Sequence, residues 1–90
     1  MMPSSIYSQL SVLSEPTRVR LLRLLEVEEL GVGELARIVQ LPQSTVSRHL
    51  KVLREDDWIS VRRMGTASLL RMDSGQLSPA AGALWRVVRE

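Results

Sequence analysis

The sequence contains no cysteine, one histidine and three aromatic residues among its 90 residues. Without cysteine the chain has no disulfide, no thiol chemistry and no thiolate ligand for a metal ion. A single histidine, His49, excludes a multi-histidine site within one chain, so we expect neither a metal ion nor another cofactor. The aromatic residues Tyr7, Trp58 and Trp85 are too few for a surface that stacks the bases of single-stranded nucleic acid on rows of rings.

Long apolar runs are also absent. No stretch of the sequence approaches the length of a transmembrane helix, and the N-terminal residues MMPSSIYSQL lack the basic start and apolar run of a signal peptide. We therefore expect a cytoplasmic protein with no membrane partner. The sequence also has no nucleophile–base pair, glycine-rich phosphate loop or metal-ligand cluster, so we expect that these residues do not form an enzyme.

Charge is unevenly distributed along the chain. The 12 Lys and Arg residues against 10 Asp and Glu give a net charge of +2, which is too small to indicate a partner by itself. Residues 43–72, however, include six basic residues and three acidic ones, and the acidic ones are consecutive, from Glu55 to Asp57. Most of the surface of this region is therefore expected to be basic, which suits a nucleic-acid partner.

The segment QSTVSRHLKVLR, residues 43–54, is the centre of this basic region. Val46, Leu50 and Leu53 recur at helical spacing and predict one apolar stripe, while the opposite face is polar and basic and suits a DNA major groove. The candidates for contacts with base edges are Gln43, Ser44, Thr45, Ser47 and Arg48, and the candidates for contacts with phosphates are Lys51, Arg54, Arg62 and Arg63. Taken alone, this segment fits an ordinary amphipathic helix with a solvated polar face equally well.

The surrounding pattern favours the DNA-binding interpretation. Apolar spacing and turn residues predict helices over 5–13, 16–27, 33–39 and 79–90, a short strand over 30–32, and strands over 58–63 and 66–72 separated by Met64-Gly65. We therefore expect a mainly α fold with a small β-hairpin, in the order helix, helix, short strand, helix, helix, hairpin, helix. A hairpin directly after a helix-turn-helix is a winged helix. The expected single domain covers 1–90, with the helix-turn-helix at 33–56, the wing at 58–72 and residues 1–4 frayed.

Other conspicuous side chains have structural interpretations. We interpret His49 as a structural histidine rather than a DNA contact or a pH switch, and both tryptophans as core or interface residues. Three arginines of the second helix lie away from most of its apolar face, and we expect them to be solvated: Arg18, Arg20 and Arg23.

Three segments resemble the arsenical-resistance-repressor (ArsR/SmtB-like) family of winged helix-turn-helix regulators. They are LSEPTRVRLLRLLE (13–26), VGELARIVQLPQSTVSRHLKVLRE (32–55) and the hairpin around residues 62–65. The resemblance implies a dimeric bacterial transcription factor, usually a repressor, in which the first and last helices, 5–13 and 79–90, form the dimer interface. By the same resemblance the interface residues are Ile6, Leu10, Leu13, Ala81, Leu84, Trp85 and Val88.

The sequence departs from the family pattern at several positions. Gly31 and Gly33 stand where metal-sensing members have cysteines, and the last helix has no histidine and only Glu90 as an acidic residue, so we expect no metal sensing. Gln40 and Asp57 stand where glycines are frequent, and glutamine tolerates the left-handed conformation less readily, so we expect slight strain in the turn. Thr66 and Ala67 replace the usual arginine and aromatic residue of the wing, which predicts weaker wing contacts with DNA.

These observations favour a dimeric, sequence-specific DNA-binding transcriptional regulator that acts as a repressor on an inverted repeat in double-stranded DNA. One alternative is a regulatory or docking front end of a longer fused protein such as a methyltransferase, because the last predicted helix runs to residue 90 without a capping glycine. Another alternative is a winged helix that binds only proteins, against which the basic face of residues 43–54 argues. No residue pattern identifies an effector.

Overall fold

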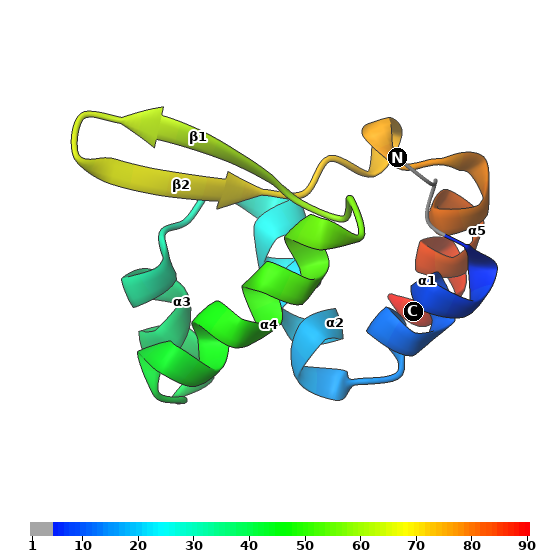
Figure 1. Ribbon diagram of the computed structural model, residues 1–90, viewed down its shortest axis with the longest axis horizontal. Helices are drawn as coiled ribbons and strands as arrows, with labels where there is room; N and C mark the ends of the chain where they lie inside the picture. Colours follow the sequence, from blue (N-terminus) through cyan, green and yellow to red (C-terminus); the bar gives the residue numbers. More distant parts are fainter. Residues whose placement is uncertain (1–4) are drawn as a thin grey trace.

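The computed structural model describes residues 5–90, and the expected frayed segment, residues 1–4, lies outside this range. Within it, five α-helices and one two-stranded antiparallel hairpin confirm the expected mainly α fold (Figure 1). The elements are α1 (Ile6–Leu13), α2 (Pro16–Val27), α3 (Val32–Val39), α4 (Gln43–Glu55), β1 (Ser60–Met64), β2 (Ala67–Arg71), the 3-10 helix η1 (Ser74–Gln76) and α5 (Pro79–Val88). None of the helices in residues 5–90 has both the length and the apolar character needed to span a bilayer.

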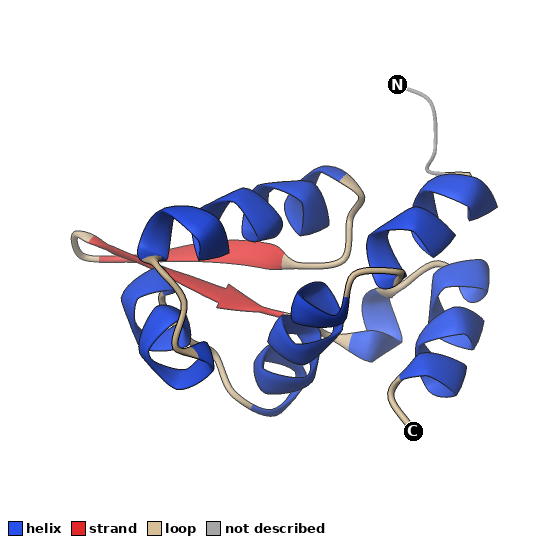
Figure 2. Cartoon of the chain, turned by 90° about the horizontal axis from the view of Figure 1, so that it is seen from below, coloured by secondary structure: helices blue, strands red, loops and turns tan. Residues whose placement is uncertain are grey.

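The elements lie in two groups at opposite ends of the molecule, with a helix between them. At one end the hairpin lies beside α3 and α4, and at the other end α1 pairs with α5 (Figure 1). Figure 2 shows the same division from below, with the strands confined to the end away from the two paired helices. Helix α2 lies between the two ends, and its Leu21, Leu22 and Leu25 are at most 1% exposed. Helix α2 therefore forms the centre of the core.

Helix α4 and the two tryptophans contribute further residues to the core. Val46, Leu50 and Leu53 are buried, which confirms the predicted apolar stripe of α4. Trp58 and Trp85 are fully buried, so both are core residues of this chain. The indole Nε1 of Trp58 donates a hydrogen bond to a side-chain oxygen of Asp56 at 2.9 Å, whereas Nε1 of Trp85 has no partner among the described residues.

Side chains at the helix starts explain three of the helix boundaries. The hydroxyls of Ser5 and Ser78 accept hydrogen bonds from the backbone N–H groups of Ser8 and Ala81, which fixes the starts of α1 and α5. The carboxylate of Glu15 accepts from the N–H of Thr17 at the start of α2, and this hydrogen bond lowers the pKa of Glu15. The predicted starts of these helices are therefore correct to within one residue.

Two left-handed residues end the helices of the helix-turn-helix. Gln40 has φ of 58° and Asp57 has φ of 63°, which agrees with their positions in place of frequent glycines. After α4 the N–H groups of Asp57 and Trp58 return to the carbonyls of Arg54 and Leu53, which is a Schellman motif. The chain leaves α4 through this turn, and Trp58, the residue that follows Asp57, is buried in the core.

The predicted strand boundaries are partly wrong. Strand β1 begins two residues later than expected, because Trp58 and Ile59 pack into the core instead of pairing with a neighbouring strand. Met64 pairs with Ala67, so the turn is Gly65-Thr66 and not Met64-Gly65. Gly65 supplies the positive φ, 62°, that the first residue of this two-residue turn requires. The expected short strand over 30–32 is reduced to one bridge between Leu30 and Leu70, because Val32 already begins α3.

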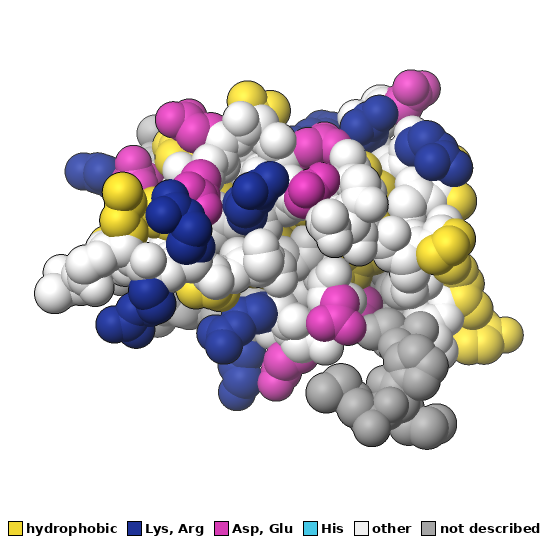
Figure 3. Space-filling model, turned by 90° about the horizontal axis from the view of Figure 1, so that it is seen from above, with side chains coloured by type: hydrophobic (Ala, Val, Ile, Leu, Met, Phe, Trp, Pro, Cys, Tyr) yellow, Lys and Arg dark blue, Asp and Glu magenta, His cyan; other side chains and the backbone are white. Residues whose placement is uncertain are grey.

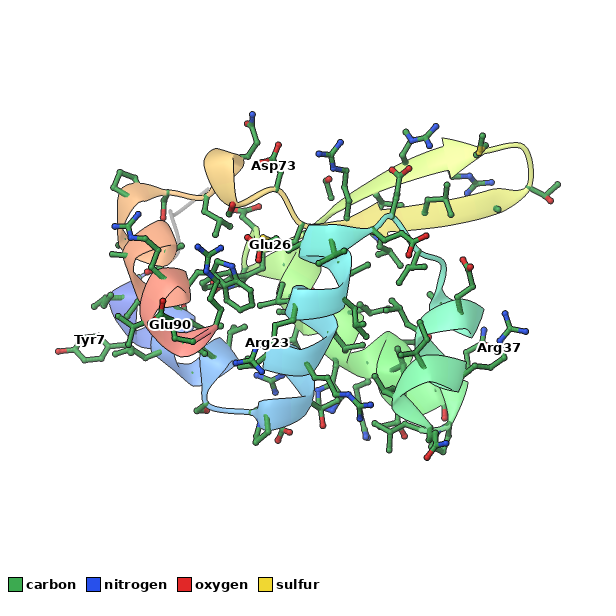
Figure 4. The ribbon with its side chains drawn as sticks, turned by 180° about the vertical axis from the view of Figure 1, so that it is seen from behind. Tyr7, Arg23, Glu26, Arg37, Asp73 and Glu90 are labelled. Atoms are coloured by element: carbon green, nitrogen blue, oxygen red, sulfur yellow. The ribbon has the colours of Figure 1, made fainter. Side chains whose placement is uncertain are left out.

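The expectation that the arginines of α2 are solvated needs a correction. Arg18 is half-buried and donates hydrogen bonds to His49 and to a carbonyl of α1. Arg20 and Arg23 are exposed, as predicted, but each also donates to a backbone carbonyl. Arg23 reaches the end of α5, where its guanidinium donates to the carbonyl of Arg89 at 2.8 Å (Figure 4). Arg89 in turn forms an ion pair with Glu26 of α2 at 3.0 Å. These contacts hold the C-terminal end of α5 against α2.

Candidate nucleic-acid interface

The polar face of α4 is open to solvent. Of the residues predicted to contact base edges, Gln43, Ser44, Ser47 and Arg48 are exposed and Thr45 is half-buried. Lys51 and Arg54, the predicted phosphate contacts on α4, are exposed. Within residues 5–90 none of the three cations of this face, Arg48, Lys51 and Arg54, forms an ion pair. The structure therefore brings these seven side chains together on one accessible helix without an internal counter-charge on the cations.

A groove separates α4 from the hairpin. It has a volume of ≈ 520 Å³, and Leu50, Val61 and Leu70 contribute apolar side chains to its lining. Lys51 and Arg54 contribute the positive charge of the same groove, and Glu55 contributes a negative one. The hairpin thus lies directly beside α4, which is the relative placement of wing and helix in a winged helix.

The two arginines of the wing are not equivalent. Arg62 forms a two-point ion pair with Glu29, in which Nη2 and Oε1 are 2.7 Å apart and Nε and Oε2 are 3.0 Å apart. This hydrogen-bonded pairing lowers the pKa of Glu29 and raises the pKa of Arg62. Because successive side chains alternate along a strand, Arg63 lies on the other face of β1, the face of Val61 and the groove. We therefore revise the predicted role of Arg62: part of its charge is already satisfied within the chain.

Charges of both signs are interspersed on the side of the molecule that carries the hairpin (Figure 3). Arg62 of β1 forms the ion pair with Glu29, and Arg71 of β2 forms a second, longer pair with Asp73 at 3.5 Å. Such exposed pairs contribute little to stability, but they remove the strong positive field that would attract phosphates. Most of the surface of residues 43–72 was expected to be basic, but the cations without an ion pair within residues 5–90 lie mainly on α4, because Arg62 and Arg71 of the hairpin are paired.

His49 is bonded to α2 and does not belong to the open face of α4. Its Nδ1 accepts a hydrogen bond from Nε of Arg18 at 3.3 Å, so the neutral ring is the form that fits. Burial, followed by the positive charges of Arg18 and Arg48, lowers the pKa of His49, and the charge of Glu15 opposes this shift. The structure agrees with the interpretation of His49 as a structural histidine.

The lowered pKa of His49 predicts how stability depends on pH. Between the folded pKa and the unfolded value of about 6.5, the unfolded chain binds more protons than the folded one. We expect the contribution of His49 to the free energy of unfolding to be complete above pH 7 and to decrease as the pH falls below about 6.5. The change is no more than about 1.4 kcal/mol per pH unit. The measurement is urea unfolding between pH 5 and 8 on the wild type and on His49→Asn, which keeps an acceptor but does not titrate. Parallel profiles for the two proteins would contradict the expectation.

The terminal helices present an apolar face, but with a different set of residues from the predicted one. Of the residues predicted for the dimer interface, Ile6 and Leu10 are 43% and 47% exposed, and Leu84 and Val88 are half-buried. Three others are buried in the core of this chain and therefore lie beneath the exposed apolar surface: Leu13, Ala81 and Trp85.

Two exposed residues of these helices were missed, Tyr7 and Val87, which are 80% and 75% exposed. Tyr7 projects outward from α1 (Figure 4), and apolar side chains gather at this end of the molecule (Figure 3). The spacing of Tyr7 and Leu10, three residues apart on one helix, was the available signal for Tyr7.

A metal site at the family's cysteine positions has no ligands here. Gly31 caps the start of α3, where its N–H donates to Oε1 of Glu34 at 3.0 Å, and Gly33 lies in the first turn of that helix. Among residues 5–90 no group of three or more His, Cys, Asp or Glu residues is arranged to hold a metal ion. The absence of metal sensing remains a prediction.

The arrangement of α3, a three-residue turn and α4, followed by a hairpin beside α4, defines a winged helix-turn-helix protein. Residues 15–61, more than half of the chain, match the family described as bacterial regulatory protein, arsR family, and the chain belongs to this family. The predicted resemblance is therefore confirmed.

Known relatives agree with this assignment. Nodulation protein NolR of Rhizobium meliloti is 37% identical over 75 residues, which cover 83% of this chain and 62% of NolR. The chain thus spans less than two thirds of that relative's length. The crystal structure of NolR from Sinorhizobium fredii is 31% identical with a TM-score of 0.74, over 99% of this chain and 98% of that one. A homodimeric winged helix-turn-helix DNA-binding domain from Mycobacterium bovis, Mb0332, is 21% identical with a TM-score of 0.77, over 99% of this chain and 87% of that one, and shares the fold.

Proposed function

We propose that this protein is a homodimeric transcriptional regulator that binds double-stranded DNA sequence-specifically and represses transcription. The observation that carries the proposal is the exposed polar face of α4, whose three cations have no ion-pair partner within residues 5–90. A solvated amphipathic helix does not need the groove and hairpin that accompany α4. Together they match the way a recognition helix and a wing contact one duplex.

Each polar residue of α4 has a proposed role. Those nearest its start, Gln43, Ser44, Thr45, Ser47 and Arg48, carry the donors and acceptors that read base edges in a major groove. Lys51 and Arg54, farther along the helix, neutralise phosphates together with Arg63 of the wing. We assign Arg62 a secondary role because it is paired with Glu29.

The dimer is proposed to form through α1 and α5. Ile6, Tyr7, Leu10 and Val87 expose apolar surface on these two helices, and a second copy that covered it would bury area that a single chain leaves in water. The homodimeric Mb0332 domain has the same fold. A two-fold dimer would read an inverted repeat whose half-sites lie about one helical turn apart.

The test is selection of bound DNA from a random pool, followed by binding of single-residue variants to the selected site. Arg48→Ala is expected to cost about 1–3 kcal/mol on the selected site and to relax the preference at one base pair. Lys51→Ala is expected to weaken binding to all sequences alike and to reduce the salt slope by about one. Arg86→Ala, an exposed cation of α5, is the control and should leave specificity unchanged. Equal losses on selected and random DNA for Arg48→Ala would contradict its role, and a pool without enrichment would contradict the proposed function.

The regulator is further proposed not to sense metals, since Gly31 and Gly33 offer no ligand. Stoichiometric Zn²⁺ is expected to leave the thermal midpoint unchanged, because an ion that does not bind the folded state cannot stabilise it. The measurement is a thermal melt with and without Zn²⁺, with a chelator-treated sample as the control. An increase of several degrees would overturn this part of the proposal.

A further inference from the structure

A carboxylate at the end of α4 connects it to α1. Asp56 caps the C-terminus of α4, and its Oδ1 accepts a hydrogen bond from the hydroxyl of Ser8 at 2.9 Å. The other oxygen, Oδ2, accepts from the indole of Trp58 at 2.9 Å, which holds the carboxylate in place. The Ser8 hydroxyl also lies 3.0 Å from the carbonyl of Ser5, and the charged carboxylate is the stronger acceptor for its single proton.

A second connection between the same two helices runs through Arg18. Its Nε donates to Nδ1 of His49 on α4 at 3.3 Å, and its Nη1 lies 3.4 Å from the carbonyl of Val12 and 3.5 Å from that of Ser11. His49 and Asp56 are seven residues apart, which is about two helical turns or roughly 10 Å along α4. A helix that is held at two points this far apart cannot pivot freely about either of them.

The other side of α1 carries the apolar residues of the proposed dimer face, Ile6 and Leu10. The helix that would meet a second copy is therefore the one bonded to the recognition helix. We infer that Ser8 and Asp56 are positioning residues that fix the angle between α1 and α4. Through this angle they set the half-site spacing that the dimer accepts. This inference rests on the proposed function, because it needs a dimer on DNA.

The effect of the angle between α1 and α4 can be measured by changing the spacing between the two half-sites. Adding or removing one base pair between half-sites moves them by about 3.4 Å and rotates them by roughly 35°. A dimer in which α4 is held rigidly cannot follow both changes and loses affinity. A dimer that lacks the Ser8–Asp56 hydrogen bond can reorient α4 on the altered site at a smaller cost in free energy. We therefore expect its preference for the selected spacing over the altered one to fall by about tenfold, which is the equilibrium value of one hydrogen bond to a charged group.

The experiment measures binding to three duplexes: the selected spacing, the same half-sites one base pair farther apart, and a single half-site. Ser8→Ala removes the hydroxyl, Ser8→Thr keeps it, and Ser11→Ala removes another hydroxyl of α1 that makes no side-chain hydrogen bond within residues 5–90. We expect Ser8→Ala to reduce the penalty for the altered spacing by about tenfold while its single half-site affinity stays within about twofold of wild type. Ser8→Thr and Ser11→Ala should keep the wild-type penalty.

Three results would overturn the inference, and they differ from one another. An unchanged spacing penalty in Ser8→Ala, with dimerisation intact by sedimentation, overturns the positioning role alone. Equal losses of affinity on all three duplexes point to a general role of Ser8 in stability and also overturn it. A wild-type protein that is monomeric or prefers no sequence overturns the proposed function and this inference with it.

Discussion

Replacing Trp58 by alanine is expected to lower the free energy of unfolding by about 3–5 kcal/mol. Trp58 is 1% exposed, follows the left-handed residue Asp57 and belongs to the core. Its removal leaves a cavity and also takes the hydrogen-bond donor away from Asp56. A domain of this size is stable by only about 5–15 kcal/mol, so the loss is a large fraction of the total.

Urea unfolding at neutral pH measures this effect as a lower midpoint with an unchanged slope. Trp58→Phe is the matched control, because it keeps most of the apolar volume and removes only the N–H donor, and it should be clearly less destabilised than Trp58→Ala. A loss of less than about 1 kcal/mol in Trp58→Ala would show that the site collapses around the missing ring and that Trp58 does not anchor the chain after α4.

Leu10→Asp is expected to convert the proposed dimer into monomers and to reduce affinity for an inverted repeat by about 100-fold or more. Leu10 is 47% exposed on α1, the helix that also exposes Ile6 and Tyr7, so in the proposed dimer a carboxylate there would be buried without a partner. The fold of the single chain has little reason to change because the side chain is not in its core. In a dimer, the second subunit binds its half-site as an intramolecular step after the first has bound. Separate monomers lose this gain in affinity.

Sedimentation velocity and a gel shift on the selected repeat together check this expectation. Val27→Asp is the control, since Val27 is 87% exposed at the end of α2 and not on α1 or α5, and it should stay dimeric and bind DNA normally. If Leu10→Asp remained dimeric, the interface would have to be sought elsewhere on the protein. If it became monomeric but kept full affinity for the repeat, the proposed link between dimerisation and DNA binding would be wrong.

Local sequence signals were sufficient for much of the fold. The spacing of Val46, Leu50 and Leu53 predicted both the helix and the side that it buries, because helical periodicity is a property of neighbouring residues. Gln40 and Asp57, in positions where glycine is frequent, were correctly expected in the left-handed conformation. These features depend on residues within one or two helical turns of one another.

Contacts between distant segments were not predictable in this way. Arg62 and Glu29 are 33 residues apart, and nothing in either neighbourhood indicates that they pair. The same holds for Arg23, which reaches carbonyls 65 and 66 residues away, and for Ser8 with Asp56. The alternation of Ile59 and Val61 with polar residues resembled a strand, but after the turn at Asp57 both Trp58 and Ile59 are buried in the core and the strand begins only at Ser60. The roles of the individual site residues on DNA remain predictions.

The pairing of Arg62 with Glu29 has a consequence for the energy of complex formation. Recruiting Arg62 to a phosphate would leave the carboxylate of Glu29 without its cation near a polyanion, so the gain of one contact would be offset by a new repulsion. In the proposed complex the hairpin would therefore contribute shape and the single cation of Arg63, while most of the positive charge facing the duplex would come from α4.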